Sequence, residues 1–267
     1  MGLIVNGVRI EERHVTTELS KRKADSEIVR WIDDLGLNAI VKACLEYLSR
    51  EHEQIAPPPP SPAFAGTVFH RRLAYDGRYC HCDCADCEYD RYDDPNVGAV
   101  SAALLDGAAY ANADPATAGD VSKLLPGHLE AYCRDLDALL PTCDRVLALR
   151  NPQWNCRVSG SLGAGILAGV PDVVDGGRLI EIKTGATAVQ HGAFQYAARQ
   201  VFLYWLLYEA QRLTWDWESD PLSELSIYLA RYGQLVTIDV AGLVNELGAT
   251  PEELYLELDA LCMGAKE

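Results

Sequence analysis

The strongest constraint in the sequence is a pair of apolar segments, GILAGVPDVV and RLIEIKT, joined by Asp175-Gly176-Gly177. An aspartate followed by glycine between two apolar runs is typical of a tight hairpin turn. The two segments are therefore predicted to form adjacent antiparallel strands. Charged side chains nevertheless interrupt both runs, and a charge that is buried without a partner is strongly unfavourable. These charges need a chemical explanation.

Three charged residues stand out on the two segments: Asp172 near the end of the first, and Glu181 and Lys183 on the second. Side chains two apart on a strand share a face, and the hairpin pairing brings Asp172 beside Glu181. Two adjacent carboxylates repel each other unless a cation lies between them, and Mg²⁺ prefers such oxygen ligands. A nearby lysine can orient or deprotonate a water that attacks a phosphate, or stabilise the developing charge. The alternative is a solvated strand face preceded by an ordinary turn.

Short motifs around these charges occur in a fixed order along the chain. They are G-x-x-x-H at 66–70, G-x-x-D at 169–172, E-x-K-T-G at 181–185 and Q-x-x-x-Y at 200–204. Together with Pro171-Asp172 they resemble the PD-(D/E)xK nuclease superfamily, and within it the RecB-like and Cas4-like exonuclease branch. The resemblance covers about residues 66 to 240.

The resemblance implies a restriction-endonuclease-like core and a metal-dependent deoxyribonuclease that uses Mg²⁺ or Mn²⁺. It implies that His70, Asp172 and Glu181 are metal ligands, with the backbone carbonyl of Ile182 completing the site. Lys183 would be the catalytic lysine. Read from the residues alone, a histidine such as His70 is also compatible with a structural or exposed position.

A polar stripe is expected on the long helix predicted at 193–213. Tyr196, Gln200, Tyr204 and Tyr208 recur every four residues and so share one helix face. The resemblance implies that Gln200 and Tyr204 position DNA or the catalytic groups, and we predict that the stripe faces the substrate. The opposite side, with Val201, Phe202, Trp205 and Leu206, is predicted to pack on the sheet. The alternative is an edge of the core whose polar tips are satisfied internally. Near His70, Arg71 and Arg72 are candidate phosphate contacts.

The order of the predicted elements indicates an α/β fold with a central mixed sheet flanked by helices. The expected elements are a hairpin at 3–18, helices at 25–53, from 66, at 97–112, 127–147 and 193–213, strands at 154–162, 165–174, 178–184, 225–232 and 235–240, and a helix from 250. We expect an N-terminal hairpin and helical extension at 1–56, a proline-rich connector at 57–65, and a nuclease domain at 66–267 with a cysteine-rich insertion at 80–87.

The cysteine-rich insertion places Cys80, Cys82, Cys84 and Cys87 close together in the sequence. Such a group favours metal binding or free thiols over disulfides in a chain that shows no secretory signal. We expect either a second metal site, with Zn²⁺ preferred to an iron–sulfur cluster, or reduced thiols without metal. The resembling nucleases that carry a cluster place most of its cysteines near the C-terminus, where this chain has only Cys262.

Composition narrows the functional class further. The formal net charge of −16 excludes a protein that coats nucleic acid through a broad basic surface, although a confined basic groove remains compatible. No apolar run approaches the roughly 20 residues that span a bilayer, so no membrane partner is expected. The start of the chain lacks the features of a secretory signal. A cytoplasmic location, or the host cell interior for a viral protein, is therefore expected.

These observations leave three functional hypotheses. The first is an exonuclease acting on DNA in recombination, repair or viral DNA processing, with a helicase or recombination protein as a partner. The second is a DNA-binding or assembly subunit that keeps the fold without turnover. The third is a restriction-type endonuclease. The acidic pair with Lys183 favours catalysis, and the helix that carries Gln200 and Tyr204 favours the exonuclease branch.

Overall fold

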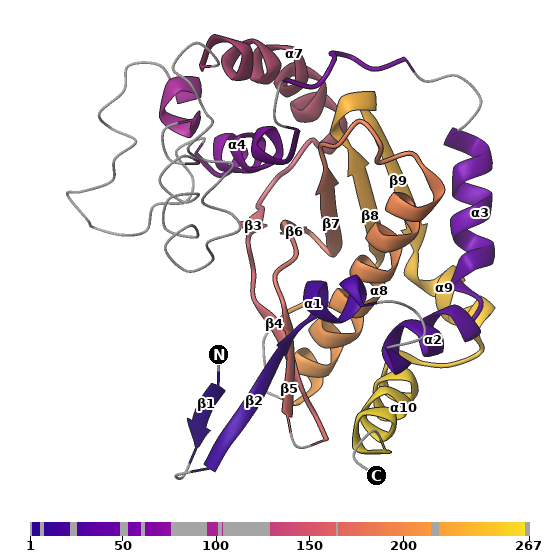
Figure 1. Ribbon diagram of the computed structural model, residues 1–267. Coiled ribbons are helices and arrows are strands. Elements are labelled where there is room, and N and C mark those ends of the chain that lie inside the picture. Colours follow the sequence, from indigo (N-terminus) through magenta and orange to yellow (C-terminus); the bar gives the residue numbers. More distant parts are fainter. Residues whose placement is uncertain are drawn as a thin grey trace.

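Two mixed β-sheets flanked by helices form the framework of the computed structural model (Figure 1). The structure describes residues 2–5, 8–21, 26–48, 53–59, 62–75, 95–100, 103, 129–163, 165–214 and 219–264. The predicted α/β class is confirmed. The prediction of a single central sheet is not, because the strands divide between a four-stranded and a five-stranded sheet.

The five-stranded sheet carries the predicted hairpin. Its order is β3 (Gln153–Trp154), β6 (Val173–Asp175), β7 (Arg178–Lys183), β8 (Glu224–Leu229) and β9 (Gln234–Asp239). Strands β6 and β7 are antiparallel with Asp175 opposite Arg178, whereas β7 and β8 are parallel. The turn residues Gly176 and Gly177 have φ angles of 56° and 83°, a region that favours glycine.

The four-stranded sheet includes the N-terminal hairpin. Its order is β1 (Gly2–Val5), β2 (Val8–His14), β5 (Gly165–Gly169) and β4 (Val158–Leu162). Strands β1 and β2 pair antiparallel, as the sequence predicts, but residues 15–18 of the expected hairpin are helical. Strand β2 also pairs in parallel with β5. The N-terminal hairpin therefore shares a sheet with the strand that leads into the Pro171-Asp172 segment.

Two of the predicted strands are each split between the two sheets. The segment expected at 165–174 forms β5 and β6, and the one expected at 154–162 starts as β3 and continues as β4. Pro171 lies at the first break, where its missing amide and fixed φ prevent a continuous ladder. Asn155 lies at the second break and has a φ of 50°. Asp172 consequently lies at the crossing between the two sheets, directly before β6.

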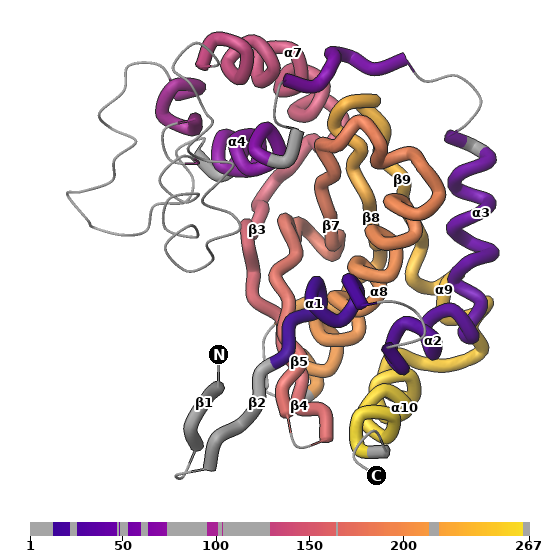
Figure 2. Tube along the Cα trace, viewed as in Figure 1, coloured from indigo at the N-terminus to yellow at the C-terminus, as the bar shows by residue number. Residues whose placement is uncertain are grey.

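The long helix α8 (His191–Thr214) is the centre of the larger hydrophobic core. Around it pack α1 (Val15–Ser20), α2 (Glu27–Asp34), α3 (Leu37–Leu48) and α10 (Pro251–Gly264), as the trace in Figure 2 shows; α9 (Val240–Leu247) follows β9. A second core lies on the other face of the five-stranded sheet, beneath α4 (Pro62–Tyr75) and α7 (Leu129–Leu147). Successive side chains of β7 point to opposite faces of the sheet, so Leu179 lies in the first core and Ile180 in the second.

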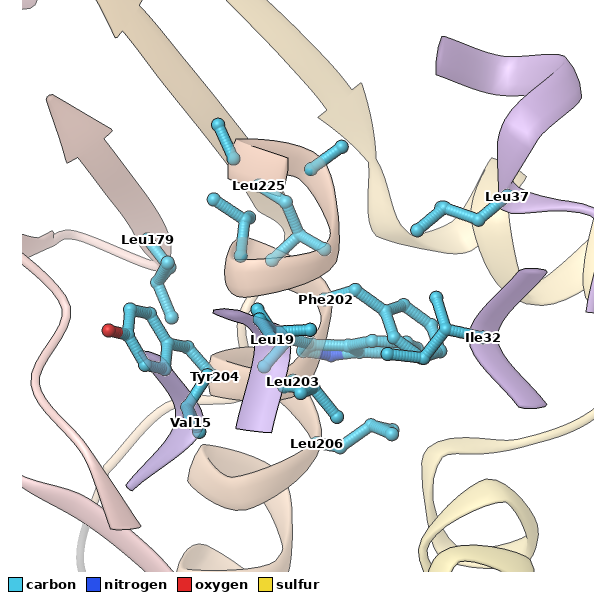
Figure 3. Close-up of a cluster of buried hydrophobic side chains, with 14 of the residues drawn as sticks. Val15, Leu19, Ile32, Leu37, Leu179, Phe202, Leu203, Tyr204, Leu206 and Leu225 are labelled. Atoms are coloured by element: carbon cyan, nitrogen blue, oxygen red, sulfur yellow. The ribbon is translucent and has the colours of Figure 1, made fainter. Parts of the chain in front are cut away.

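The side of α8 that packs on the sheet differs from the predicted one. Figure 3 shows Tyr204 beside Val15 and Leu179 on the sheet side, whereas Phe202 points toward Ile32 of α2. The Phe202 ring also lies 6.1 Å from that of Trp31, between ring centroids. The N-terminal helices cover the side of α8 that faces away from the sheet, so this side is apolar as well. Periodicity along α8 alone cannot show which of its two apolar sides packs on the sheet.

Several helix boundaries also follow local chemistry. The helix expected at 25–53 is two helices, α2 and α3, which are separated at Gly36 with a φ of 88°. Helix α4 begins at Pro62, so the last residues of the expected connector at 57–65 are helical. Residues 95–100 are helical, while most of the helix expected at 97–112 lies outside the described residues. Helix α10 starts with a reciprocal cap in which Thr250 and Glu253 bond each other.

None of the helices in the described part of the chain combines the length and the apolar character that a membrane span requires.

Candidate functional site

The predicted site residues converge where the two sheets meet. His70 projects from α4, Asp172 from the segment before β6, and Glu181 and Lys183 from β7. The Nδ1 atom of His70 lies 3.1 Å from Oδ1 of Asp172, and Nζ of Lys183 lies 2.7 Å from Oε1 of Glu181. Because Val173 pairs with Ile180, the hairpin register places Asp172 opposite Glu181. The structure thus brings together side chains from three separate segments.

The second carboxylate oxygen of Asp172 is held by the backbone of β7. The amide of Ile182 donates to Oδ2 of Asp172 at 2.7 Å. The Ile182 side chain points into the opposite core, so only its main chain reaches the site. Asp172 is therefore fixed from two sides, by a histidine ring and by the strand that carries Glu181.

Burial and like charge act together on Glu181. Its exposed fraction is 4%. Burial, together with the negative charge of Asp172, raises the pKa of Glu181 to about 7, against the opposing effect of Lys183. Its Oε2 atom is buried and has no hydrogen-bond partner among the described residues. A buried carboxylate oxygen in this position is an atom that a cation would satisfy.

His70 and Asp172 stabilise each other's charged forms. Burial alone would raise the pKa of Asp172, but the charge and hydrogen bond of His70 and the amide of Ile182 hold that pKa below its usual value. Burial alone would lower the pKa of His70, but Asp172 and Glu181 raise it. Lys183 supplies positive charge beside the two neighbouring carboxylates, and His70 adds to it when its ring is protonated.

The Q-x-x-x-Y motif forms a hydrogen-bond chain that starts at the lysine. Lys183 Nζ donates to Gln200 Oε1 at 2.9 Å, and Gln200 Nε2 donates to the Tyr204 hydroxyl at 2.8 Å. The ring centroid of Tyr196 lies 5.9 Å from Lys183 Nζ. Gln200 and Tyr204 are only 5% and 2% exposed. Their position suits them to hold Lys183, which is one of the two roles that the resemblance implies; the contact with DNA stays a prediction.

Tyr208 does not belong to this chain of bonds. Its side chain is buried, and its hydroxyl donates to the backbone carbonyl of Asp220 at 3.1 Å. On a helix, eight residues correspond to about 12 Å of rise, which carries Tyr208 away from Gln200. The predicted stripe is thus divided, with Tyr196, Gln200 and Tyr204 near Lys183 and Tyr208 elsewhere in the core.

The motif glycines permit close approach of the elements that carry the site. A Cβ atom added at Gly66 would lie 2.7 Å from Oγ1 of Thr184, so its absence lets α4 reach the end of β7. A Cβ atom at Gly169 would lie 2.1 Å from the ring of Tyr204. Each glycine therefore has a packing role beside a polar motif residue.

Replacing Gly169 with alanine is expected to lower the free energy of unfolding by about 1–3 kcal/mol, because the added methyl group overpacks a rigid contact. The Tyr204 ring cannot move away easily, since it is buried and its hydroxyl is hydrogen-bonded. Urea denaturation measures the loss. Gly192→Ala is the matched control, because a Cβ atom there meets nothing within 4 Å. Equal stability of the two variants would contradict the close-approach argument.

The remaining predicted site residues are Arg71 and the group of four cysteines. Arg71 is half-buried on α4 beside His70, and its phosphate-binding role stays a prediction. The predicted second metal site lies outside the described residues; it consists of Cys80, Cys82, Cys84 and Cys87. Within the described part of the chain, no three His, Cys, Asp or Glu side chains form a ready-made metal site. Of the three predicted ligands, Glu181 offers an acceptor atom, Oε2, that has no partner among the described residues.

One buried residue near the site, Arg231, was missed by the sequence analysis. Thr184 directly follows the lysine, and Arg231 donates from Nε to the Thr184 carbonyl at 2.9 Å. The available signal for Arg231 was an arginine within the apolar run LSIYLARY, because buried arginines need several acceptors.

Comparisons with known proteins add little to this geometry. No protein-family model matches the chain, and no curated protein does. Among solved structures, the chain is similar to one described as "Crystal structure of SSO0001", with 14% sequence identity and a TM-score of 0.23 over 81% of this chain and 84% of that chain.

Proposed function

We propose that the chain is a divalent-metal-dependent deoxyribonuclease with a PD-(D/E)xK core of the RecB-like type, acting as an exonuclease. The observation that carries the proposal is twofold: the fold brings His70, Asp172, Glu181 and Lys183 together, and Oε2 of Glu181 is buried without a partner among the described residues. A structural salt-bridge cluster does not require that arrangement, because burying an unpaired carboxylate oxygen is unfavourable.

The metal would be held by His70, Asp172 and Glu181 together with the carbonyl of Ile182. When bound, a divalent ion supplies an activated water and stabilises the charge that develops on the phosphate. Mg²⁺ and Mn²⁺ suit this donor set, because carboxylate and carbonyl oxygens are their preferred ligands.

Lys183 is the residue placed to act on the reacting groups. Glu181 and Gln200 fix its ammonium group from two sides, and its side chain keeps 25% exposure. The side chain of His70 is 33% exposed, so solvent reaches both residues. A positioned ammonium there can orient the attacking water and stabilise the negative charge on the phosphate in the transition state.

A cleavage assay tests the proposed function. Linear and circular DNA, each single- and double-stranded, are incubated with the protein and Mg²⁺ or Mn²⁺. We expect linear DNA to be degraded and closed circles to survive. Nicked circles would favour an endonuclease, and DNA binding without cleavage under either metal would favour a non-catalytic subunit. Either result would contradict the exonuclease assignment.

The affinity for Mn²⁺ is expected to increase with pH. The pKa of Glu181 is raised to about 7, so below pH 7 the metal must displace a proton. Each displaced proton changes the affinity by up to about tenfold per pH unit below the pKa, and the dependence flattens above it. The raised pKa of His70 acts in the same direction.

Calorimetric titrations at pH 6, 7 and 8 measure this dependence. The control is Glu181→Gln, which keeps the side-chain shape but cannot ionise; it should bind Mn²⁺ weakly at each pH and show a smaller pH dependence, of which the remainder comes from His70. An equal affinity of the unmodified protein at pH 6 and pH 8 would show that Glu181 is not a ligand.

A further inference from the structure

A fully buried arginine lies directly behind the strand that carries the site. Arg231 is 0% exposed and belongs to a short 3₁₀ helix, η4 (Ala230–Tyr232), after β8. Its two terminal nitrogens bond both carboxylate oxygens of Asp135 on α7, at 2.6 and 2.7 Å. Asp135 is itself only 6% exposed. Such two-point pairing fixes the plane of the guanidinium group.

The other donors of Arg231 point at backbone carbonyls from two distant segments. Nε donates to Thr184 at the end of β7, and Nη1 donates to Ala56 at 3.3 Å and Pro57 at 3.5 Å. In return, the carbonyl of Arg231 accepts from the amide of Ile55 at 2.7 Å. One side chain thus ties the proline-rich connector, α7 and the end of β7 together.

Thr184 is the point at which this bonding reaches the site. It directly follows Lys183, and its Oγ1 lies where a Cβ atom on Gly66 of α4 would clash. Gly66 precedes His70 by about one helical turn. The carbonyl that Arg231 holds is therefore on the residue that sets the position of Lys183 along the strand and the approach of the His70 helix.

Stability alone is a weak explanation for this buried ion pair. Replacing a buried pair with apolar residues of similar volume is often neutral or stabilising, because desolvating two charges is unfavourable. A lysine in place of Arg231 could not reach Asp135, Thr184 and the connector together. We propose that Arg231 and Asp135 are positioning residues, which hold Thr184 so that Lys183 and His70 keep their places in the site. This inference rests on the proposed nuclease function for its catalytic consequence.

The test uses the double variant Arg231→Met with Asp135→Leu, which replaces the charges by apolar groups of similar size. The control is Arg199→Met with Asp33→Leu. The Arg199–Asp33 ion pair is also largely buried, and it joins α8 to α2. Two readouts are compared: the single-turnover cleavage rate with the Kd for DNA, and amide hydrogen exchange in peptides covering 178–186 and 53–59.

The Arg231 and Asp135 double variant should cleave about 10- to 100-fold more slowly with a nearly unchanged Kd for DNA, because a small misplacement of catalytic groups costs rate rather than binding. Exchange should accelerate in the two named peptides and not in the α2 and α8 peptides. The control should keep its cleavage rate. An unchanged cleavage rate in the Arg231 and Asp135 variant would overturn the positioning role while leaving the nuclease function intact.

A failure of the proposed nuclease function can be distinguished from a failure of the proposed positioning role. If the unmodified protein cleaves no DNA, the nuclease function fails, and hydrogen exchange alone decides the positioning role: faster exchange in 178–186 supports it, and unchanged exchange overturns it. If the double variant does not fold, Arg231→Lys is judged by the same measurements, because it keeps a positive charge opposite Asp135 but loses the bonds to Thr184 and the connector.

Discussion

Replacing Lys183 with methionine is expected to slow DNA cleavage by about 10²- to 10⁴-fold, the range seen when a positioned acid–base or electrostatic group is removed. Methionine keeps the length of the side chain but removes the ammonium group that bonds Glu181 and Gln200. Single-turnover rates at saturating Mg²⁺ measure the effect. The affinity for Mn²⁺ should not fall, because the variant retains both carboxylates and loses a competing positive charge.

Lys42→Met is the matched control for this experiment. Lys42 is on α3 with a side chain that is 75% exposed, and it lies 3.9 Å from the carboxylate of Glu46. The control should cleave at the rate of the unmodified protein. A Lys183→Met variant that stays within about threefold of that rate would remove Lys183 from the mechanism.

Replacing Asp172 with asparagine is expected to abolish both Mn²⁺ binding and cleavage. The change removes the negative charge beside His70. In the unmodified protein the Ile182 N–H donates to the Asp172 carboxylate, and the NH₂ group of an asparagine can instead face that N–H. A bound ion contributes several kcal/mol to transition-state stabilisation, which corresponds to about 10³-fold or more in rate. Calorimetry with Mn²⁺ and the cleavage assay measure the two losses together.

Asp220→Asn serves as the control for Asp172→Asn. Asp220 is exposed, and its backbone carbonyl, which the substitution leaves in place, accepts a hydrogen bond from the Tyr208 hydroxyl. Thermal unfolding of both variants establishes that they fold. If Asp172→Asn binds Mn²⁺ as tightly as the unmodified protein does, the assigned ligand set is wrong, whatever happens to cleavage.

Local features of the sequence predicted which charged side chains lie together better than they predicted the sheet. The turn at Asp175-Gly176-Gly177 fixes the pairing of β6 with β7, and the alternation along β7 puts Glu181 and Lys183 on one face. Both inferences need only short-range geometry. The division of the strands into two sheets depends on how β2 pairs with β5, a contact between distant segments that no local pattern contains.

The burial of α8 also depends on distant segments that no local pattern contains. The four-residue spacing correctly groups Tyr196, Gln200 and Tyr204 near Lys183, since side chains at that spacing share a face. The spacing cannot show whether that face is covered, and here Val15 and Leu179 pack against Tyr204. For the same reason Arg231 was missed, because its acceptors come from segments far away in the sequence.

The central claim is that His70, Asp172 and Glu181 share one divalent cation with the Ile182 carbonyl. Crystals of the protein soaked in MnCl₂, measured for the anomalous signal of manganese, test this claim most directly. The account predicts an anomalous peak in contact with both carboxylates and the imidazole, with Lys183 adjacent to it. A manganese peak elsewhere, or bound manganese that leaves Glu181 paired only with Lys183, would contradict it.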